Sequence, residues 1–244
     1  EFIYEVTDGL PPPPVYFPLN VKMNREGYDH IDDIIERGTQ KLSPSQLEDL
    51  VSSKNAIVLD VRNQKDFIEH HIPNSIFIGL DGGFAPWVGA LVADVSQSII
   101  LIAPEGREEE AVTRLARVGF DHTIGYLDGG IAKWKFEGKD TANLKSVSAS
   151  TFKNDLNMNT AIFDVRNDNE YKTSRMLTAV HTPLSSFTKE LEEYTNERPF
   201  YVYCAGGYRS VIAASILKSK GIHNVIDIAG GFNAIKAAGI GVIS

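Results

Sequence analysis

The chain has 244 residues, 43% of them hydrophobic, and a formal net charge of -8. This length suits two domains of ordinary size, and the negative charge offers no basic field for nucleic acid or an anionic membrane surface. No stretch approaches the roughly 20 apolar residues of a membrane span, and the first residues lack the basic and apolar regions of a signal peptide. The sequence therefore predicts a soluble, cytoplasmic protein without nucleic-acid or membrane partners.

Residues 1–38 form an amino-terminal extension that we expect to lie outside the domains. Pro11, Pro12, Pro13 and Pro14 favour a polyproline II rod, which suits a stiff connector. A flexible linker and an arm packed on the first domain both fit this extension. Because the chain does not begin with methionine, we expect it to be a fragment or a processed product of a longer protein.

An internal repeat organises the remaining residues. Residues 56–63, with the sequence AIVLDVRN, recur as residues 161–167, with the sequence AIFDVRN. Upstream, Ser43 and Ser148 each stand where the N-cap of a short helix is expected. Downstream, both copies carry a Gly-Gly pair near their end. The predicted homologous domains are residues 39–142 and 143–244.

Short β-branched runs alternate with amphipathic stretches in both copies. The strand candidates are residues 57–61, 99–102, 162–165 and 200–203, and the helix candidates include residues 109–118 and 210–220. Strand, helix and strand in succession indicate parallel pairing, so each domain should be an open parallel α/β sheet flanked by helices on both faces. Because such sheets bind ligands beyond the carboxyl ends of their strands, the residues after Tyr203 lie at the expected site.

The only cysteine, Cys204, opens a glycine-bearing loop between a strand and a helix. Gly206 and Gly207 can adopt positive φ, which lets successive backbone N–H groups turn inward as an anion nest. Arg209 adds a cation where the helix begins, and the helix N-terminus adds partial positive charge. We therefore expect Cys204 and Arg209 to be catalytic, with Cys204 a thiolate at neutral pH and its persulfide anion stabilised by the same amides.

Several neighbours complete the predicted site. The substrate-binding loop comprises Ala205, Gly206, Gly207, Tyr208 and Ser210. We expect the Tyr208 side chain to rim the pocket and Ser210 to cap the helix, a hydrogen bond from Ser210 to the sulfur being the alternative. Asp164 and Arg166 should support the loop framework, with Arg166 paired to Glu170. A single cysteine and isolated histidines match no metal-site spacing, so no metal is predicted.

The loop from Cys204 to Arg209 resembles the active-site loop of rhodanese-family sulfurtransferases. The Asp-Val-Arg after the first strand, the Gly-Gly pair near the end and the domain length are similar to that family as well. The resemblance implies a double displacement, in which Cys204 takes the outer sulfur of a small donor, thiosulfate or a low-molecular-weight persulfide, and passes it to a thiol or another acceptor. It implies neither a metal nor an organic cofactor.

Two other interpretations stay open. Cysteine phosphatases resemble this loop but place their arginine one position later, where this chain has Ser210. Alternatively, the chain is a non-catalytic interaction module in which Cys204 is a redox sensor that forms sulfenic acid or mixed disulfides. A mass increase of one sulfur after treatment with thiosulfate would separate the enzyme from the sensor.

The first copy carries the corresponding loop without a nucleophile. Aligning the fourth strands places Ala103 opposite Cys204. Acidic residues put negative charge where an anion cradle needs positive charge. They are Glu105, Glu108, Glu109 and Glu110. We therefore expect the first domain to be inactive, whether it borders the pocket or serves only as a folded spacer.

Residues 79–89 are apolar and glycine-rich, have no counterpart in the second copy and suit a contact surface. With the proline-rich start, they resemble the region that follows a metallo-β-lactamase-like domain in fusions of a persulfide dioxygenase with a rhodanese. The resemblance implies that the chain is the carboxyl part of a sulfide- or persulfide-oxidising protein, whose metal-binding domain is missing here. The sequence leaves the oligomeric state open.

Overall fold

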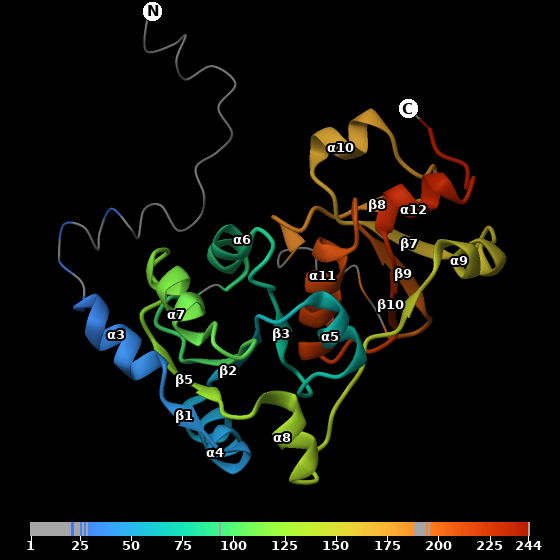
Figure 1. Ribbon diagram of the computed structural model, residues 1–244. Coiled ribbons are helices and arrows are strands. Elements are labelled where there is room, and N and C mark those ends of the chain that lie inside the picture. Colours follow the sequence, from blue (N-terminus) through green and yellow to red (C-terminus); the bar gives the residue numbers. More distant parts are fainter. Residues whose placement is uncertain are drawn as a thin grey trace, which may run out of the picture.

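The computed structural model describes residues 21, 25, 27, 29–92, 94–187, 194 and 196–243. The predicted polyproline rod at Pro11–Pro14 lies outside these residues. Within them, the chain folds into two units that each repeat strands and helices in alternation (Figure 1). No helix in the described ranges is long and apolar enough to cross a membrane.

The first unit contains a five-stranded parallel sheet with the order β1-β5-β4-β2-β3. Its strands are β1 (Lys41–Leu42), β2 (Ile57–Asp60), β3 (Ile76–Phe77), β4 (Ile99–Ile102) and β5 (Thr123–Leu127). Its helices are α3 (Ile31–Gly38), α4 (Pro44–Lys54), α5 (Gln64–Glu69), α6 (Phe84–Leu91), α7 (Glu108–Ala116) and α8 (Gly130–Phe136).

The second unit repeats this arrangement with the strand order β6-β10-β9-β7-β8, again all parallel. Its strands are β6 (Ser146–Val147), β7 (Ala161–Asp164), β8 (Val180–His181), β9 (Phe200–Tyr203) and β10 (Val225–Ile228). Its helices are α9 (Ala149–Asp155), α10 (Asp168–Thr173), α11 (Tyr208–Ser219) and α12 (Gly231–Ala237). Two parallel sheets flanked by helices confirm the predicted α/β fold.

Matching N-caps begin the first helix after the opening strand of each sheet. The Ser43 hydroxyl accepts the Gln46 backbone N–H at 3.3 Å, and the Ser148 hydroxyl accepts that of Thr151 at 3.1 Å. Each bond satisfies one of the amide groups that a helix start leaves without an intrahelical partner. Both serine caps that the repeat predicted are therefore confirmed.

Helix α3 comes from the part of the extension that the structure describes, and it packs on the first unit against α7 and β5. Ile34 enters the hydrophobic core, and the Arg37 guanidinium donates a 2.7 Å hydrogen bond to the Asp121 carbonyl. Residues 31–38 thus form a packed arm.

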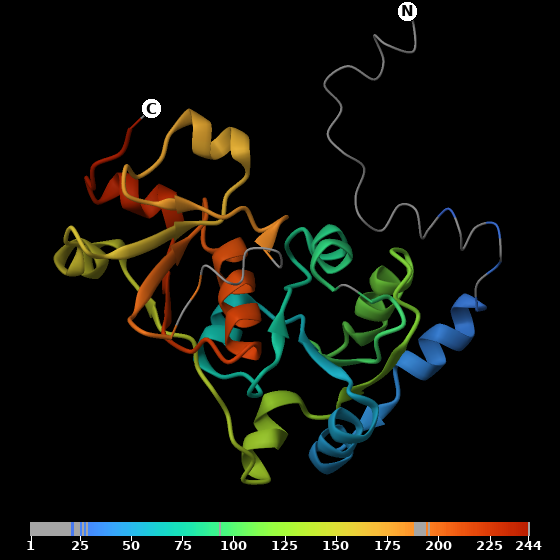
Figure 2. The ribbon, with the colours of Figure 1, turned by 180° about the vertical axis from the view of Figure 1, so that it is seen from behind.

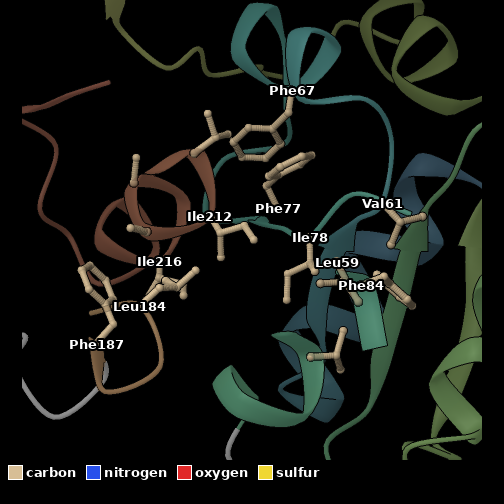
Figure 3. Packing of buried hydrophobic residues seen from close by; sticks show 14 of the residues in the cluster. Leu59, Val61, Phe67, Phe77, Ile78, Phe84, Leu184, Phe187, Ile212 and Ile216 are labelled. Carbon is tan, nitrogen blue, oxygen red and sulfur yellow. The ribbon is translucent and has the colours of Figure 1, made fainter. Parts of the chain in front are cut away.

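One hydrophobic cluster joins the two units, with α11 at its centre. Residues 210–217 of this helix are all buried, so α11 is covered on every side. Figures 1 and 2 show α11 beside β3 and α5 of the first unit, and Figure 3 shows Ile212 of α11 in the same cluster as Phe77 and Phe67 of the first unit. The Phe77 backbone N–H also donates to the Ser215 hydroxyl at 2.9 Å. The helix that follows Cys204 is therefore shared by both units.

Candidate active site

Cys204 lies directly after β9, a strand inside the second sheet, at the carboxyl end expected for a ligand site. Its side chain is buried, with 1% of the residue exposed. The Gly207 backbone N–H donates to the sulfur across 3.1 Å, and Gly207 holds φ at +104° as the N-cap of α11. Gly206 does not lie in the left-handed region, so only one of the two loop glycines uses its conformational freedom. The sulfur thus receives a backbone amide at the start of a helix.

Gly231 holds the Cys204 loop from the other side. The Phe232 N–H donates to the Cys204 carbonyl at 2.6 Å, and the Asn233 N–H donates to the Ala205 carbonyl at 3.1 Å. A Cβ on Gly231 would lie 2.2 Å from the Cys204 carbonyl oxygen. The second glycine of the Gly-Gly pair is therefore required by a close backbone approach at the nucleophile.

Arg209 is fixed by a two-pronged ion pair with Glu170 on α10. Nη1 donates to Oε2 at 2.6 Å and Nη2 to Oε1 at 2.7 Å. These hydrogen bonds, together with the nearby sulfur of Cys204, raise the pKa of Arg209 above its ordinary value, and the pair lowers the pKa of Glu170. The guanidinium thus stays charged beside the sulfur, while Glu170 balances much of its charge.

The prediction that Arg166 pairs with Glu170 is wrong, because Arg166 pairs with Asp164. Arg166 Nε and Nη2 donate to the Asp164 carboxylate at 2.9 and 2.6 Å, and Arg166 stacks 3.8 Å above the Phe232 ring. The Tyr203 hydroxyl donates to the same carboxylate at 2.8 Å. Arg166 stands two residues after Asp164, so its guanidinium reaches that carboxylate directly. Glu170 pairs with Arg209 instead. The pair of Asp164 and Arg166 thus contacts Tyr203, the residue that precedes Cys204.

The same ion pair recurs in the first unit, where Arg62 donates to Asp60 at 2.6 Å. Ala103 follows β4 at the position equivalent to Cys204, and Gly106 keeps a positive φ of +79°. Arg107 is engaged by Glu110 at 2.7 Å and by Asp81 at 2.8 Å. This loop also has a positive-φ glycine four residues after the last residue of the strand, but it reaches its helix one residue later and carries no thiol.

Ser210 does not cap α11, contrary to the prediction, because the helix begins at Tyr208 with Gly207 as its N-cap. Its hydroxyl lies within hydrogen-bond distance of Asp227, at 2.6 Å, and of the Cys204 sulfur, at 3.7 Å, so the structure has the alternative contact, from Ser210 to the sulfur. Asp227 is 1% exposed and was missed by the sequence analysis. The available signal was one carboxyl among apolar residues in the strand sequence VIDI.

Tyr208 points from the Cys204 loop into the boundary between the units. Its hydroxyl donates to the Gly79 carbonyl at 2.8 Å, and its ring lies edge-on to Phe77 at a centroid distance of 5.8 Å. Gly82 lies so close that an added Cβ would fall 2.2 Å from the Tyr208 ring. A cavity of about 450 Å³ adjoins this contact. Its lining comprises Arg62, Asn63, Gln64, Lys65, Phe77, Gly79, Asp81, Gly82 and Tyr208.

No group of three or more histidine, cysteine or carboxylate side chains in the described part of the chain could hold a metal ion. The arrangement around Cys204 can support the chemistry of a nucleophilic sulfur. A buried thiolate or persulfide anion would be stabilised by the Gly207 amide, the α11 N-terminus and the charge of Arg209.

Comparison with known families gives one match in each unit. A family model of the rhodanese-like domain matches residues 43–137 and 148–238. A thiosulfate sulfurtransferase of Coxiella burnetii, GlpE, is 32% identical over 76 residues, which make up 31% of this chain and 71% of that relative.

Three further matches cover a smaller share of the matched protein. The chain spans about half of two of them. A tRNA uridine(34) hydroxylase of Buchnera aphidicola is 28% identical over 153 residues, or 58% of this chain and 45% of the relative. The uncharacterized protein YqhL of Bacillus subtilis is 34% identical over 71 residues, which make up 29% of this chain and 56% of that relative. A solved thiosulfate sulfurtransferase from Pseudomonas aeruginosa is 21% identical with a TM-score of 0.37, over 83% of this chain and 43% of that one.

Proposed function

The chain belongs to the rhodanese-like domain family, and we propose that it is a sulfurtransferase that carries sulfur as a persulfide on Cys204. The observation that carries the proposal is the Gly207 N–H aimed at the Cys204 sulfur, at the start of a helix and beside the Arg209 cation. Donors of this kind stabilise an anion in a site with little water. They do so for the thiolate that attacks and for the persulfide that it becomes.

In the proposed reaction, the Cys204 thiolate attacks the outer sulfur of thiosulfate. The sulfur–sulfur bond of the donor breaks, its electron pair leaves with sulfite, and a new sulfur–sulfur bond forms on Cys204. A thiolate acceptor then attacks that outer sulfur, and Cys204 leaves as a thiolate. No external oxidant or reductant is needed, because each displacement forms one sulfur–sulfur bond and breaks another.

Burial narrows the class of donor. With 1% of Cys204 exposed, the attacked sulfur has to reach it as a terminal atom. Thiosulfate and low-molecular-weight persulfides both present such a sulfur. We include both in the proposal, with a small thiol as acceptor, and we place the reaction in the cytoplasm, where an unpaired cysteine stays reduced.

The wider context extends the same proposal. The proline-rich start and residues 79–89 resemble the region after a metallo-β-lactamase-like domain, which favours a role beside a persulfide-oxidising partner domain. Co-purification of a longer native protein carrying that domain would support this context. A native chain without it would contradict the context and leave the transfer reaction in place.

The test of the transfer reaction is an intact mass after incubation with thiosulfate. We expect one added sulfur on Cys204, removed by cyanide or a thiol, and no addition in Cys204→Ser. Because the chain has one cysteine, the mass change assigns the site directly. Addition of oxygen under peroxide, with no sulfur gained from thiosulfate or a small persulfide, would favour the redox sensor instead.

A further inference from the structure

Asp227 is a buried carboxyl behind the Cys204 loop, and the reaction above does not use it. It lies on β10 between the apolar residues Ile226 and Ile228 and is 1% exposed. Two hydroxyls satisfy it, one on each oxygen. Ser146 donates to Oδ2 at 2.6 Å, and Ser210 donates to Oδ1 at 2.6 Å. A carboxyl kept in such a place is costly unless fully hydrogen-bonded, and one of its two partners reaches the sulfur.

Ser210 has a single hydroxyl proton and three acceptors around it. Asp227 Oδ1 is 2.6 Å away, the Gly207 carbonyl 3.0 Å and the Cys204 sulfur 3.7 Å. The proton can serve only one acceptor fully at a time. The short distance and the charge of an ionised carboxylate direct it mainly to Asp227, so the hydrogen bond to the sulfur at 3.7 Å is weak.

We propose that Asp227 is a positioning residue that controls, through Ser210, whether an anionic sulfur on Cys204 receives a hydroxyl hydrogen bond. A neutral Asp227 would donate its own proton to the Ser210 oxygen, which frees the Ser210 proton to turn toward the sulfur. A charged Asp227 withholds that proton and also repels a second anion nearby. Neutral Asp227 and anionic sulfur therefore favour each other. The inference rests on the proposed function only in making Cys204 the reactive sulfur.

The surroundings of Asp227 make this proton exchange accessible. Burial raises its pKa to about 6, against the lowering effect of the Ser146 and Ser210 hydroxyls. Among the described residues, the pKa of Asp227 is thus set by burial and by these two hydroxyls, and not by a charged side chain. Val202 of β9 is the register partner of Asp227, and Cys204 comes directly after the end of that strand. The charged groups on the far side of the sulfur are Arg209 and its partner Glu170. Asp227 can thus change charge close to neutral pH.

The experiment measures alkylation of Cys204 by iodoacetamide as a function of pH, in Asp227→Asn and in the unaltered protein. Asparagine keeps the shape and both hydroxyl contacts but cannot ionise. We expect the midpoint of the rate profile to fall by roughly one pH unit, which is about tenfold faster alkylation below the original midpoint. The matched control Asp155→Asn removes an exposed carboxylate of the same unit and should leave the midpoint unchanged.

A second arm tests the link through Ser210. In a Ser210→Ala background, Asp227→Asn should shift the midpoint by much less. In the unaltered protein, the logarithm of the rate should bend near pH 6, and Ser210→Ala should make that bend much smaller, so the test survives if Asp227→Asn does not fold. An unchanged or raised midpoint in Asp227→Asn, or no bend in the unaltered protein, would overturn the inference. A shifted midpoint without any persulfide formation would instead overturn the proposed function alone.

Discussion

Replacing Gly231 by alanine should damage the fold and the site together, because one added methyl group meets the backbone of the nucleophile. The new Cβ would lie 2.2 Å from the Cys204 carbonyl oxygen and 2.9 Å from the Ala205 carbonyl carbon. Neither neighbour is a flexible side chain that can turn away. Gly231 also has a φ of +55°, in the left-handed region that alanine disfavours.

The cost can be worked from these contacts. The left-handed backbone costs alanine about 1–2 kcal/mol. Moving the Cys204 loop away breaks the hydrogen bonds from Phe232 to Cys204 and from Asn233 to Ala205, each a net of about 0.5–1.5 kcal/mol. We expect a total of about 2–5 kcal/mol, against the roughly 5–15 kcal/mol that stabilises a typical domain.

Urea unfolding measures this loss, and transfer of sulfur from thiosulfate to cyanide measures the effect on the site. Gly206→Ala is the matched control in the same loop. Its added Cβ meets nothing within 4 Å and its φ is not left-handed, so stability should change by less than about 1 kcal/mol and turnover should persist. If Gly231→Ala unfolds and turns over like the unaltered protein, the argument from close backbone approach is refuted.

Three further outcomes are expected. Gly82→Ala should displace the Tyr208 ring and cost about 1–3 kcal/mol in urea unfolding, and an unchanged midpoint would show that the boundary can relax. Burial lowers the pKa of His71 to about 4, below its unfolded value of about 6.5. The unfolded chain therefore binds the proton first, so stability should fall by about 3 kcal/mol as the pH drops from 6.5 to 4. His71→Phe should flatten that part of a pH series of unfolding curves. Asp164→Asn leaves the Arg166 guanidinium buried without its counter-ion and should cost about 3–5 kcal/mol, measured by chemical unfolding; a loss below 1 kcal/mol would mean that solvent reaches the pair.

Much of the fold could be predicted because the repeated segments carry their own signals. The four-residue strands made mostly of apolar or aromatic residues and the serine N-caps are visible within short windows. The two-residue strands β1, β3, β6 and β8 are not, because their pairing is set by neighbours far away in the chain. Two residues are too few to show a period, so only the assembled sheet reveals them.

The site residues also divide into those that a short window of sequence reveals and those that only the folded sheet brings together. Cys204, Gly207 and Arg209 could be recognised together because they are contiguous. Glu170 and Asp227 could not, because they lie 39 residues from Arg209 and 17 from Ser210 and meet them only through the parallel sheet. The error on Arg166 has this origin as well. A charge three or four residues along a helix was favoured over the strand-end carboxylate two residues before it.

The first unit has a physical role that its missing nucleophile does not remove. Helix α11 is buried on all sides, and its own sheet can cover only one of them. The first unit covers another, through the cluster that contains Phe77 and Ile212 and the hydrogen bond from Phe77 to Ser215. Tyr208, the first residue of α11, donates a hydrogen bond from its hydroxyl to the Gly79 carbonyl of the first unit. Because α11 begins where the Cys204 loop ends, contacts from the first unit set the position of the helix start that faces the sulfur. A folded spacer would not need these contacts, so the first unit is part of the structure that positions the nucleophile.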